Sequence, residues 1–208
     1  PALPEGPAAV EVALNGQDFA ASGLRFRALP GPEVARITPR ALPARAPATL
    51  LVHAESLRAG APYQCVLGRL PPRPAALVSE RLARCVLPAL PPGNYSLHLE
   101  LPCGRAAASA ARELIVVEPW TLLRAIPETG PLLAAGALVT LAGAGFMELE
   151  GLRCRIGGVA TSARVLSADR ALCEWDGGSF DAGAPGVALE LSGALVSNVL
   201  PFGAGAAR

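Results

Sequence analysis

Cysteine is the residue type in this chain whose spacing most clearly predicts chemistry. Cys65 and Cys85 form one pair, and Cys154 and Cys173 repeat it 89 and 88 residues further along the chain. A motif that recurs at a nearly fixed period indicates repeated domains. Neither pair has the short spacing of zinc ligands, and recurring pairs favour disulfides made in an oxidising compartment. We therefore expect a Cys65–Cys85 and a Cys154–Cys173 disulfide; the alternative is that all 5 cysteines are buried thiols.

Cys103 lies outside this pattern. It follows the alternating segment 95–101 and precedes a stretch of small residues at 106–111. An odd cysteine beside paired ones is either a free thiol or a partner for a cysteine elsewhere. We expect Cys103 to be unpaired, or to form an intermolecular bridge to another subunit or to another part of a longer chain.

Other residue types give little indication of catalysis or metal binding. The two histidines, His53 and His98, have no second ligand at metal-binding spacing. Gly143-Ala144-Gly145 begins a dinucleotide-binding pattern, but Glu148 stands where the third glycine should be. Gly177-Gly178-Ser179 lacks the second glycine of a nucleophile elbow. The sequence predicts no enzymatic activity, no cofactor and no metal site.

The charge balance argues against binding to nucleic acid or to anionic membrane surfaces. Only 17% of the residues are charged, and the formal net charge is +1. A local basic cluster consists of Arg69, Arg73, Arg81 and Arg84. Glu80 lies within it and no aromatic residue interleaves, so we interpret it as a solvated face. We expect no nucleic-acid partner.

A membrane-spanning segment is also not expected. Residues 130–147 are uncharged and long enough to raise the question. They contain Pro131 and several glycines, and the counterpart one period earlier contains Arg45, His53 and Glu55, which a membrane span would not tolerate. Any membrane association would therefore occur through regions outside residues 1–208.

One modification motif accompanies the cysteines. Asn94-Tyr95-Ser96 is an N-glycosylation sequon that follows Pro91-Pro92-Gly93, so it lies where a loop enters a strand. Such sequons also arise by chance. Asn94 is our candidate glycosylation site.

Strand patterns dominate the whole chain. Residues 95–101 alternate between apolar and polar side chains, and Asn15-Gly16 is a strong hairpin signal. Phe202 follows Phe26 by 176 residues, twice the period of 88. About seven short strands per period predict an all-β chain of tandem immunoglobulin-like antiparallel β-sandwiches. The expected domains are 1–30, the C-terminal hairpin of a truncated repeat, and two whole repeats at 31–118 and 119–208.

The last repeat resembles the IPT/TIG family, the immunoglobulin-like domains of plexins and transcription factors. The matching order is a Pro/Gly opening, a Gly-x-Gly-Phe turn, a Cys-x-x-Gly motif, a second cysteine and a closing hairpin. In this chain these are Pro127–Pro131, Gly143–Phe146, Cys154–Gly157, Cys173 and 187–202.

The repeat 31–118 departs from the family pattern at the turn. In the positions of Gly143, Gly145 and Phe146 it has Glu55, Leu57 and Arg58. If one residue is inserted, Leu57 takes the place of Phe146 instead. Residues 1–30 keep only the end of the pattern.

The resemblance implies a fold more strongly than an activity. Such domains occur in tandem in cell-surface receptors, so it implies a non-catalytic structural or adhesive segment of a secreted or cell-surface protein. The short junctions at Pro30–Pro32 and Glu118–Trp120 favour a semi-rigid rod. The expected partners are other protein chains or neighbouring domains, and the expected location is extracellular or at the cell surface, a cilium or flagellum included. The alternatives are an intracellular scaffold in a filament or ciliary assembly and an accessory carbohydrate-binding module of an enzyme.

Overall fold

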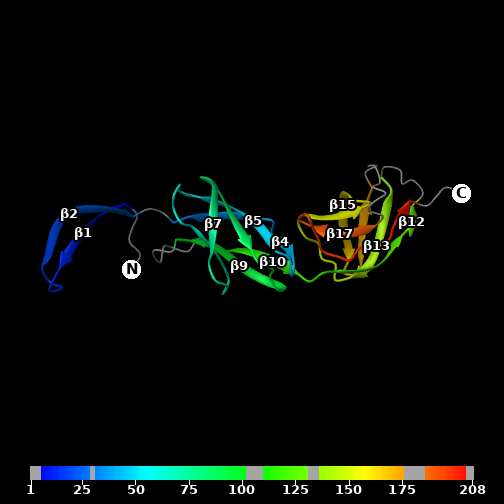
Figure 1. The fold of residues 1–208 in the computed structure, drawn as a ribbon, viewed down its shortest axis with the longest axis horizontal. Coiled ribbons are helices and arrows are strands. Elements are labelled where there is room, and N and C mark those ends of the chain that lie inside the picture. Colours follow the sequence, from blue (N-terminus) through cyan, green and yellow to red (C-terminus); the bar gives the residue numbers. More distant parts are fainter. Residues whose placement is uncertain (1–5, 29–30, 102–109, 131–135, 176–185, 205–208) are drawn as a thin grey trace. The chain divides into compact units, whose positions relative to one another are not determined.

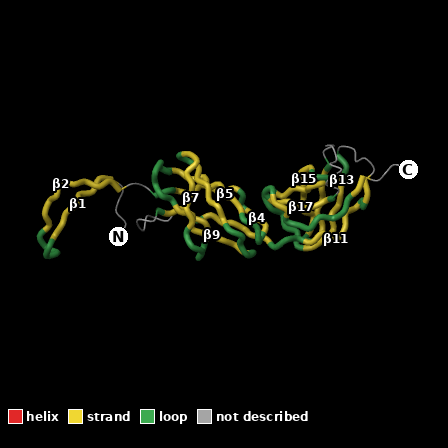
Figure 2. Tube along the Cα trace, in the orientation of Figure 1, coloured by secondary structure: helices red, strands yellow, loops and turns green. Residues whose placement is uncertain are grey.

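The structure is a computed structural model of the chain, and it describes residues 6–28, 31–101, 110–130, 136–175 and 186–204. All regular elements among these residues are β-strands, and Figures 1 and 2 show strands joined by loops without a helix. The predicted all-β fold class is therefore confirmed. In the described part of the chain, no helix has the length and hydropathy that a membrane crossing requires.

The first element is a separate antiparallel hairpin of β1 (Gly6–Ala13) and β2 (Phe19–Ala28). Asn15 closes its turn, because its side-chain oxygen accepts hydrogen bonds from the backbone N–H groups of Gln17 at 3.0 Å and of Asp18 at 2.8 Å. An Asx turn of this kind explains why the Asn-Gly dipeptide predicts the hairpin. The strand β2 begins earlier than the segment 24–28 that alternation alone indicates, and the register shifts between Ala9 and Glu11.

The middle of the chain forms one sheet with the strand order β3-β5-β8-β7-β6-β9-β10-β4. Its strands are β3 (Glu33–Thr38), β4 (Ala41–Pro43), β5 (Ala48–Glu55), β6 (Gln64–Leu67), β7 (Arg73–Ser79), β8 (Leu82–Leu87), β9 (Gly93–Glu100) and β10 (Arg112–Val117). Buried and exposed positions alternate along β8, which is the pattern of a strand with one face in the core.

The last part of the chain repeats this arrangement in the order β11-β13-β16-β15-β14-β17-β18, with β12 and β19 as a separate pair. Its strands are β11 (Thr121–Ile126), β12 (Thr129–Gly130), β13 (Leu138–Ala144), β14 (Leu152–Ile156), β15 (Val159–Ser167), β16 (Arg170–Glu174), β17 (Val187–Leu191), β18 (Ala194–Leu195) and β19 (Gly203–Ala204).

The period of 88 residues also holds for the strand pairing. Ala41 pairs in parallel with Ile115, and Thr129, one period later than Ala41, pairs in parallel with Gly203. Pro39 and Pro127, which are also 88 residues apart, both follow cis peptide bonds. The two repeats therefore share their topology, including a parallel pair that the hydrophobic pattern does not indicate.

A large cluster of buried residues fills the last repeat. It includes Trp120, Phe146, Trp175 and Phe202, each at most 4% exposed, and Val117 belongs to the same cluster. The final hairpin differs from the expected strand 195–202, because β18 spans only Ala194–Leu195 and a single bridge then joins Val187 to Leu200. Strand pairing in the final hairpin is interrupted where a side chain, instead of the backbone, forms the hydrogen bond to β17.

The chain divides into two compact units. The first comprises Pro1–Arg36, Leu51–Cys85 and Leu97–Arg112, and the second comprises Ile37–Leu50, Val86–Ser96 and Glu113–Arg208. This division does not follow the sequence period. The boundaries near residues 30 and 118 therefore stay predictions.

Candidate functional site

The four paired cysteines lie at the point where each sheet folds over on itself. Cys65 on β6 and Cys85 on β8 form a disulfide, with Cα atoms 6.2 Å apart, and β7 lies between their strands. Cys154 on β14 and Cys173 on β16 form the second, at 5.7 Å, with β15 between them. Two strands that flank a third in a flat sheet are about 10 Å apart. The shorter separations mean that each sheet bends at its middle strand and that the disulfide joins the two layers.

The middle strand makes this bend by changing partners along its length. Residues 159–162 of β15 pair with β14, and residues 162–167 pair with β16. Ser162 is the switch point, because it lies opposite both Arg153 and Glu174. The cysteines on either side face inward and are fully buried.

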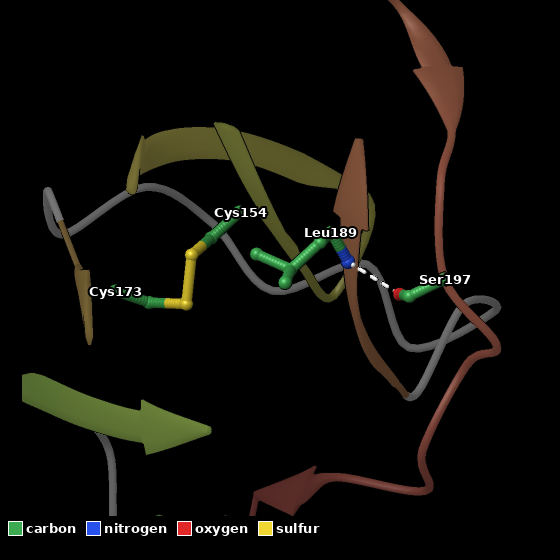
Figure 3. The surroundings of a disulfide bond; sticks show 4 residues. All are labelled: Cys154, Cys173, Leu189 and Ser197. Atoms are coloured by element: carbon green, nitrogen blue, oxygen red, sulfur yellow. Dashed lines mark hydrogen bonds between the residues drawn. A yellow bond between two sulfur atoms is a disulfide. The ribbon is translucent and has the colours of Figure 1, made fainter. Parts of the chain in front are cut away.

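The surroundings of the second disulfide show what holds the neighbouring strand. Leu189 of β17 lies directly opposite Cys154, and its backbone N–H donates a hydrogen bond to Ser197 Oγ at 2.8 Å (Figure 3). The Ser197 hydroxyl in turn donates to the Asn198 carbonyl oxygen at 2.9 Å. A side chain thus replaces the missing backbone partner in the final hairpin.

Asn198 clamps the first strand of the repeat to its last segment. Its side-chain oxygen accepts from the Leu122 N–H at 2.7 Å, and its side-chain nitrogen donates to the Leu122 carbonyl at 3.1 Å. This pair of bonds imitates a rung of a β-ladder between residues 76 positions apart. Sequence reasoning missed Asn198, since an asparagine in a loop has no distinctive spacing.

The turn Gly143–Phe146 explains why its motif needs glycine. A Cβ on Gly143 would lie 2.6 Å from Phe146 Cζ and would also collide with the Thr121 carbonyl. Gly145 has φ +88°, and a Cβ there would lie 3.3 Å from Trp120 Cδ1. Trp120 packs its ring on Phe146 with centroids 5.7 Å apart. Only glycine allows the backbone to pass this close to both rings.

The corresponding turn of the repeat 31–118 has the same length but comes one residue sooner, because Leu57 follows Pro39 by 18 residues and Phe146 follows Pro127 by 19. Ser56 has φ +61° and precedes buried Leu57, as Gly145 precedes buried Phe146. The Ala54 N–H donates to the Arg81 carbonyl, as the Gly143 N–H donates to Asp169. Of the two alignments left open by the sequence, the one that places Leu57 at the position of Phe146 fits this geometry.

The remaining candidate residues are dispersed. Asn94 and Ser96 are exposed on β9, where the Tyr95 hydroxyl donates to the Pro91 carbonyl at 2.8 Å. Cys103 lies outside the described residues. The basic cluster is exposed on different elements: Arg69 in a turn, Arg73 on β7, Arg81 between strands and Arg84 on β8, with exposed Glu80 beside Arg81.

Neither histidine lies in a metal-binding group. Burial and the positive charge of Arg36 lower the pKa of His53 below its usual 6.5. His98 Nε2 lies 3.9 Å from Glu100 Oε2. Among the described residues, no cluster of three or more His, Cys, Asp or Glu side chains could hold a metal ion.

A pocket of about 300 Å³ in the second compact unit also lacks reactive groups. It is lined by Pro39, Leu42, Pro43, Ala46, Pro47, Ala48, Thr49, Ser192, Gly193 and Ala194. Two hydroxyls are the only side-chain polar groups in this lining. The described site residues therefore form a structural framework of buried disulfides, glycine turns and side-chain clamps.

Comparison with known proteins supports the fold and leaves the activity open. No protein-family model matches the chain, and no curated protein sequence matches it. Two solved structures of the full extracellular region of plexin A4 are similar to it, with TM-scores of 0.52 and 0.54 at 13% identity over 83% of the chain. The chain spans 18% and 15% of those plexin chains. At this identity the similarity shows a shared β-sandwich fold.

Proposed function

We propose that the chain is a non-catalytic structural or adhesive segment of a secreted or cell-surface protein, built from tandem IPT/TIG-like domains. The observation that carries the proposal is the recurrence, in both repeats, of one strand order with a buried disulfide joining its two layers. Disulfides persist outside the cytosol, which favours an extracellular location. The partners would be other protein chains or neighbouring domains.

The proposed domains are 1–30, 31–118 and 119–208. Position Phe26 supports the assignment of 1–30 to an incomplete repeat: its side chain is 47% exposed, whereas Leu114 and Phe202, one and two periods later, are at most 1% exposed. Phe26 thus occupies a position that is buried in the core of the two later repeats, but its own side chain is exposed. Two strands alone are marginally stable in water. We expect fast backbone amide exchange over residues 6–28 and slow exchange in both repeats; equal protection of the hairpin would contradict the assignment.

A carbohydrate-binding module is a weaker candidate. Neutral sugars are commonly held by exposed aromatic rings, but Trp120, Trp175 and Tyr63 are all at most 4% exposed. Among the residues that the structure describes, the exposed phenylalanines Phe19 and Phe26 both belong to the hairpin. The comparisons give no support to a ciliary or flagellar location.

The decisive experiment is intact-mass measurement of the native chain from an oxidising and from a reducing expression host. We expect two disulfides in the first, each gaining two hydrogens on reduction, with Cys103 alone labelled by a thiol reagent before reduction. Chains that are fully folded with all 5 thiols free in both hosts would instead favour an intracellular scaffold.

Two sites can be tested in the same material. We propose Asn94 as a glycan acceptor, because it and Ser96 are exposed. Secretion from a eukaryotic host should add a glycan that Asn94→Gln removes. A dimer that disappears in Cys103→Ser would assign Cys103 to an intermolecular bridge, and its absence would leave it a free thiol.

A further inference from the structure

Four arginines follow one another diagonally on the outer side of the last repeat, three on the layer that contains β11, β13 and β16 and one on β14, beyond the fold at β15. Arg124 on β11 lies opposite Ala142, and Ala142 lies opposite Arg170 on β16. Adjacent strands are about 4.8 Å apart, so these two arginines are about 10 Å apart across a small alanine. We call Arg124, Arg170, Arg164 and Arg153 the arginine stripe.

The other two members continue the line toward the fold in the sheet. Arg164 on β15 lies opposite Leu172, two residues from Arg170, and Arg153 on β14 lies opposite Ser162, two residues from Arg164. Such diagonal neighbours have Cα atoms about 7–8 Å apart. All four side chains are exposed, because their adjacent residues Ala125, Ala163, Cys154 and Ala171 face inward.

The charges of the stripe are only partly neutralised. None of the four guanidinium groups belongs to an ion pair among the described residues, whereas nearby Arg155 pairs with Glu190 at 3.3 Å. Glu174 lies to one side of the stripe, opposite Ser162, and the Glu148 carboxylate accepts from the Val165 N–H beside Arg164 at 3.0 Å. Asp169 lies at the edge of the stripe, where its carboxylate accepts from the Ser167 hydroxyl at 2.5 Å and interacts with the charge of Arg170. Four arginines against these three carboxylates leave the stripe with one positive charge in excess.

The other repeat shows that the fold does not require this stripe. One period earlier, Arg36 corresponds to Arg124, but Leu82 stands at the position of Arg170 and Ala76 at that of Arg164. Gln64 precedes Cys65 where Arg153 precedes Cys154. The same strand order forms without three of the four arginines. These side chains are therefore available for binding.

We propose that the arginine stripe binds a linear acidic polysaccharide, with its sulfate or carboxylate groups on the guanidinium groups. Arginine presents a planar fork that matches both anions. A line of cations on an open sheet face suits an extended polymer, and exposed Ile126 and Leu138 on the same face can contact the C–H faces of sugar rings. The choice of a polysaccharide over nucleic acid rests on the proposed extracellular location.

The test is binding of the complete chain to immobilised heparin and to polygalacturonate, with neutral dextran as the blank. Wild type is compared with the triple variant R124Q/R164Q/R170Q and with R25Q/R27Q/R58Q, which loses the same charge at residues that do not belong to the stripe. We expect salt-sensitive binding to at least one anionic polymer. It should weaken at least about tenfold in the stripe variant and less than about twofold in the control, because only the former loses charge-assisted hydrogen bonds. Heparin and polygalacturonate separate sulfate from carboxylate recognition.

Several outcomes would overturn the proposal. The proposal is wrong if the wild-type chain binds neither polymer. It is also wrong if both variants lose the same amount of binding, because an equal loss indicates an effect of net charge. Single-stranded DNA or polyglutamate that binds as tightly as the better polysaccharide would reassign the stripe to nucleic acid or to an acidic protein. Circular dichroism must show that both variants melt within a few degrees of wild type; if the stripe variant unfolds, the single variants R124Q and R164Q replace it. None of these results alters the disulfide and glycan tests, so the two proposals fail separately.

Discussion

The rings of Trp120 and Phe146 lie with their centroids 5.7 Å apart and their planes tilted by 59°. This tilted packing is possible because Gly143 and Gly145 leave the space that two Cβ atoms would fill. Trp120 begins the repeat, and its backbone N–H donates to the Val196 carbonyl near the end of the repeat at 2.6 Å. The pair therefore closes the core where the first strand, the glycine turn and the last segment meet.

Gly143→Ala should destabilise the second compact unit. The new methyl group would overlap the Phe146 ring and the Thr121 carbonyl, and neither can retreat within a filled core. Overpacking of this kind costs about 1–3 kcal/mol. Urea denaturation followed by tryptophan fluorescence would measure the loss.

Gly145→Ala tests the turn Gly143–Phe146 further, and Gly193→Ala in another turn is its matched control. Both residues have nearly the same φ, +88° and +85°, but a Cβ at Gly145 meets Trp120 while one at Gly193 has nothing within 4 Å. Each should lose about 1–2 kcal/mol to left-handed backbone strain. Gly145→Ala should lose more, and equal losses would show that Trp120 moves aside freely.

Asn198→Ala should lower stability by about 1–3 kcal/mol, because it leaves both backbone groups of buried Leu122 without their partner. Asn15→Ala is the control: it makes the same truncation, but Asn15 bonds only within its own exposed turn. A thermal melt of the core should shift for the first variant alone. No shift for Asn198→Ala would mean that water replaces the clamp.

His53 should make the stability depend on pH in the weakly acidic range. Its pKa is lowered by burial first and by Arg36 second, so the unfolded chain binds the proton more readily. The contribution of neutral His53 is therefore complete above about pH 6.5 and is lost as the pH falls toward the lowered value of the folded state. His53→Gln should flatten this part of the profile, measured by denaturation at a series of pH values.

Arg36→Gln tests the second cause directly. Removing the neighbouring positive charge should raise the pKa of His53 toward its usual value while leaving it below that value, because burial remains. An NMR titration of the imidazole protons reports this shift. A pKa that does not move would mean that burial alone is responsible.

Much of the fold could be predicted because it depends on local patterns. Alternation along 95–101 follows from a strand with one face in the core, and β9 occupies Gly93–Glu100. The Asn15-Gly16 hairpin follows from a turn that the asparagine side chain closes by itself. The period of 88 residues likewise carried the strand order from one repeat to the other, since equivalent side chains fill equivalent positions.

Features that join distant segments were not predictable. The parallel pairing of Ala41 with Ile115 has no local signal, and neither has the clamp of Asn198 on Leu122. The one-residue difference in length before Leu57 and Phe146 left two alignments open, and the burial of Leu57 and the backbone geometry of Ser56 distinguish them.

The series of β-repeats and the two recurring cysteine pairs can be read from the linear chain, because periodicity and spacing are properties of the sequence. The change of partners along β7 and β15, which brings strands two positions apart within disulfide distance, depends on how the strands pack in three dimensions. This packing also aligns Arg124, Arg170, Arg164 and Arg153, which are scattered over 47 positions of the sequence. Sheet register, which depends on contacts between distant strands, places three of them on one layer and Arg153 next to them across the fold.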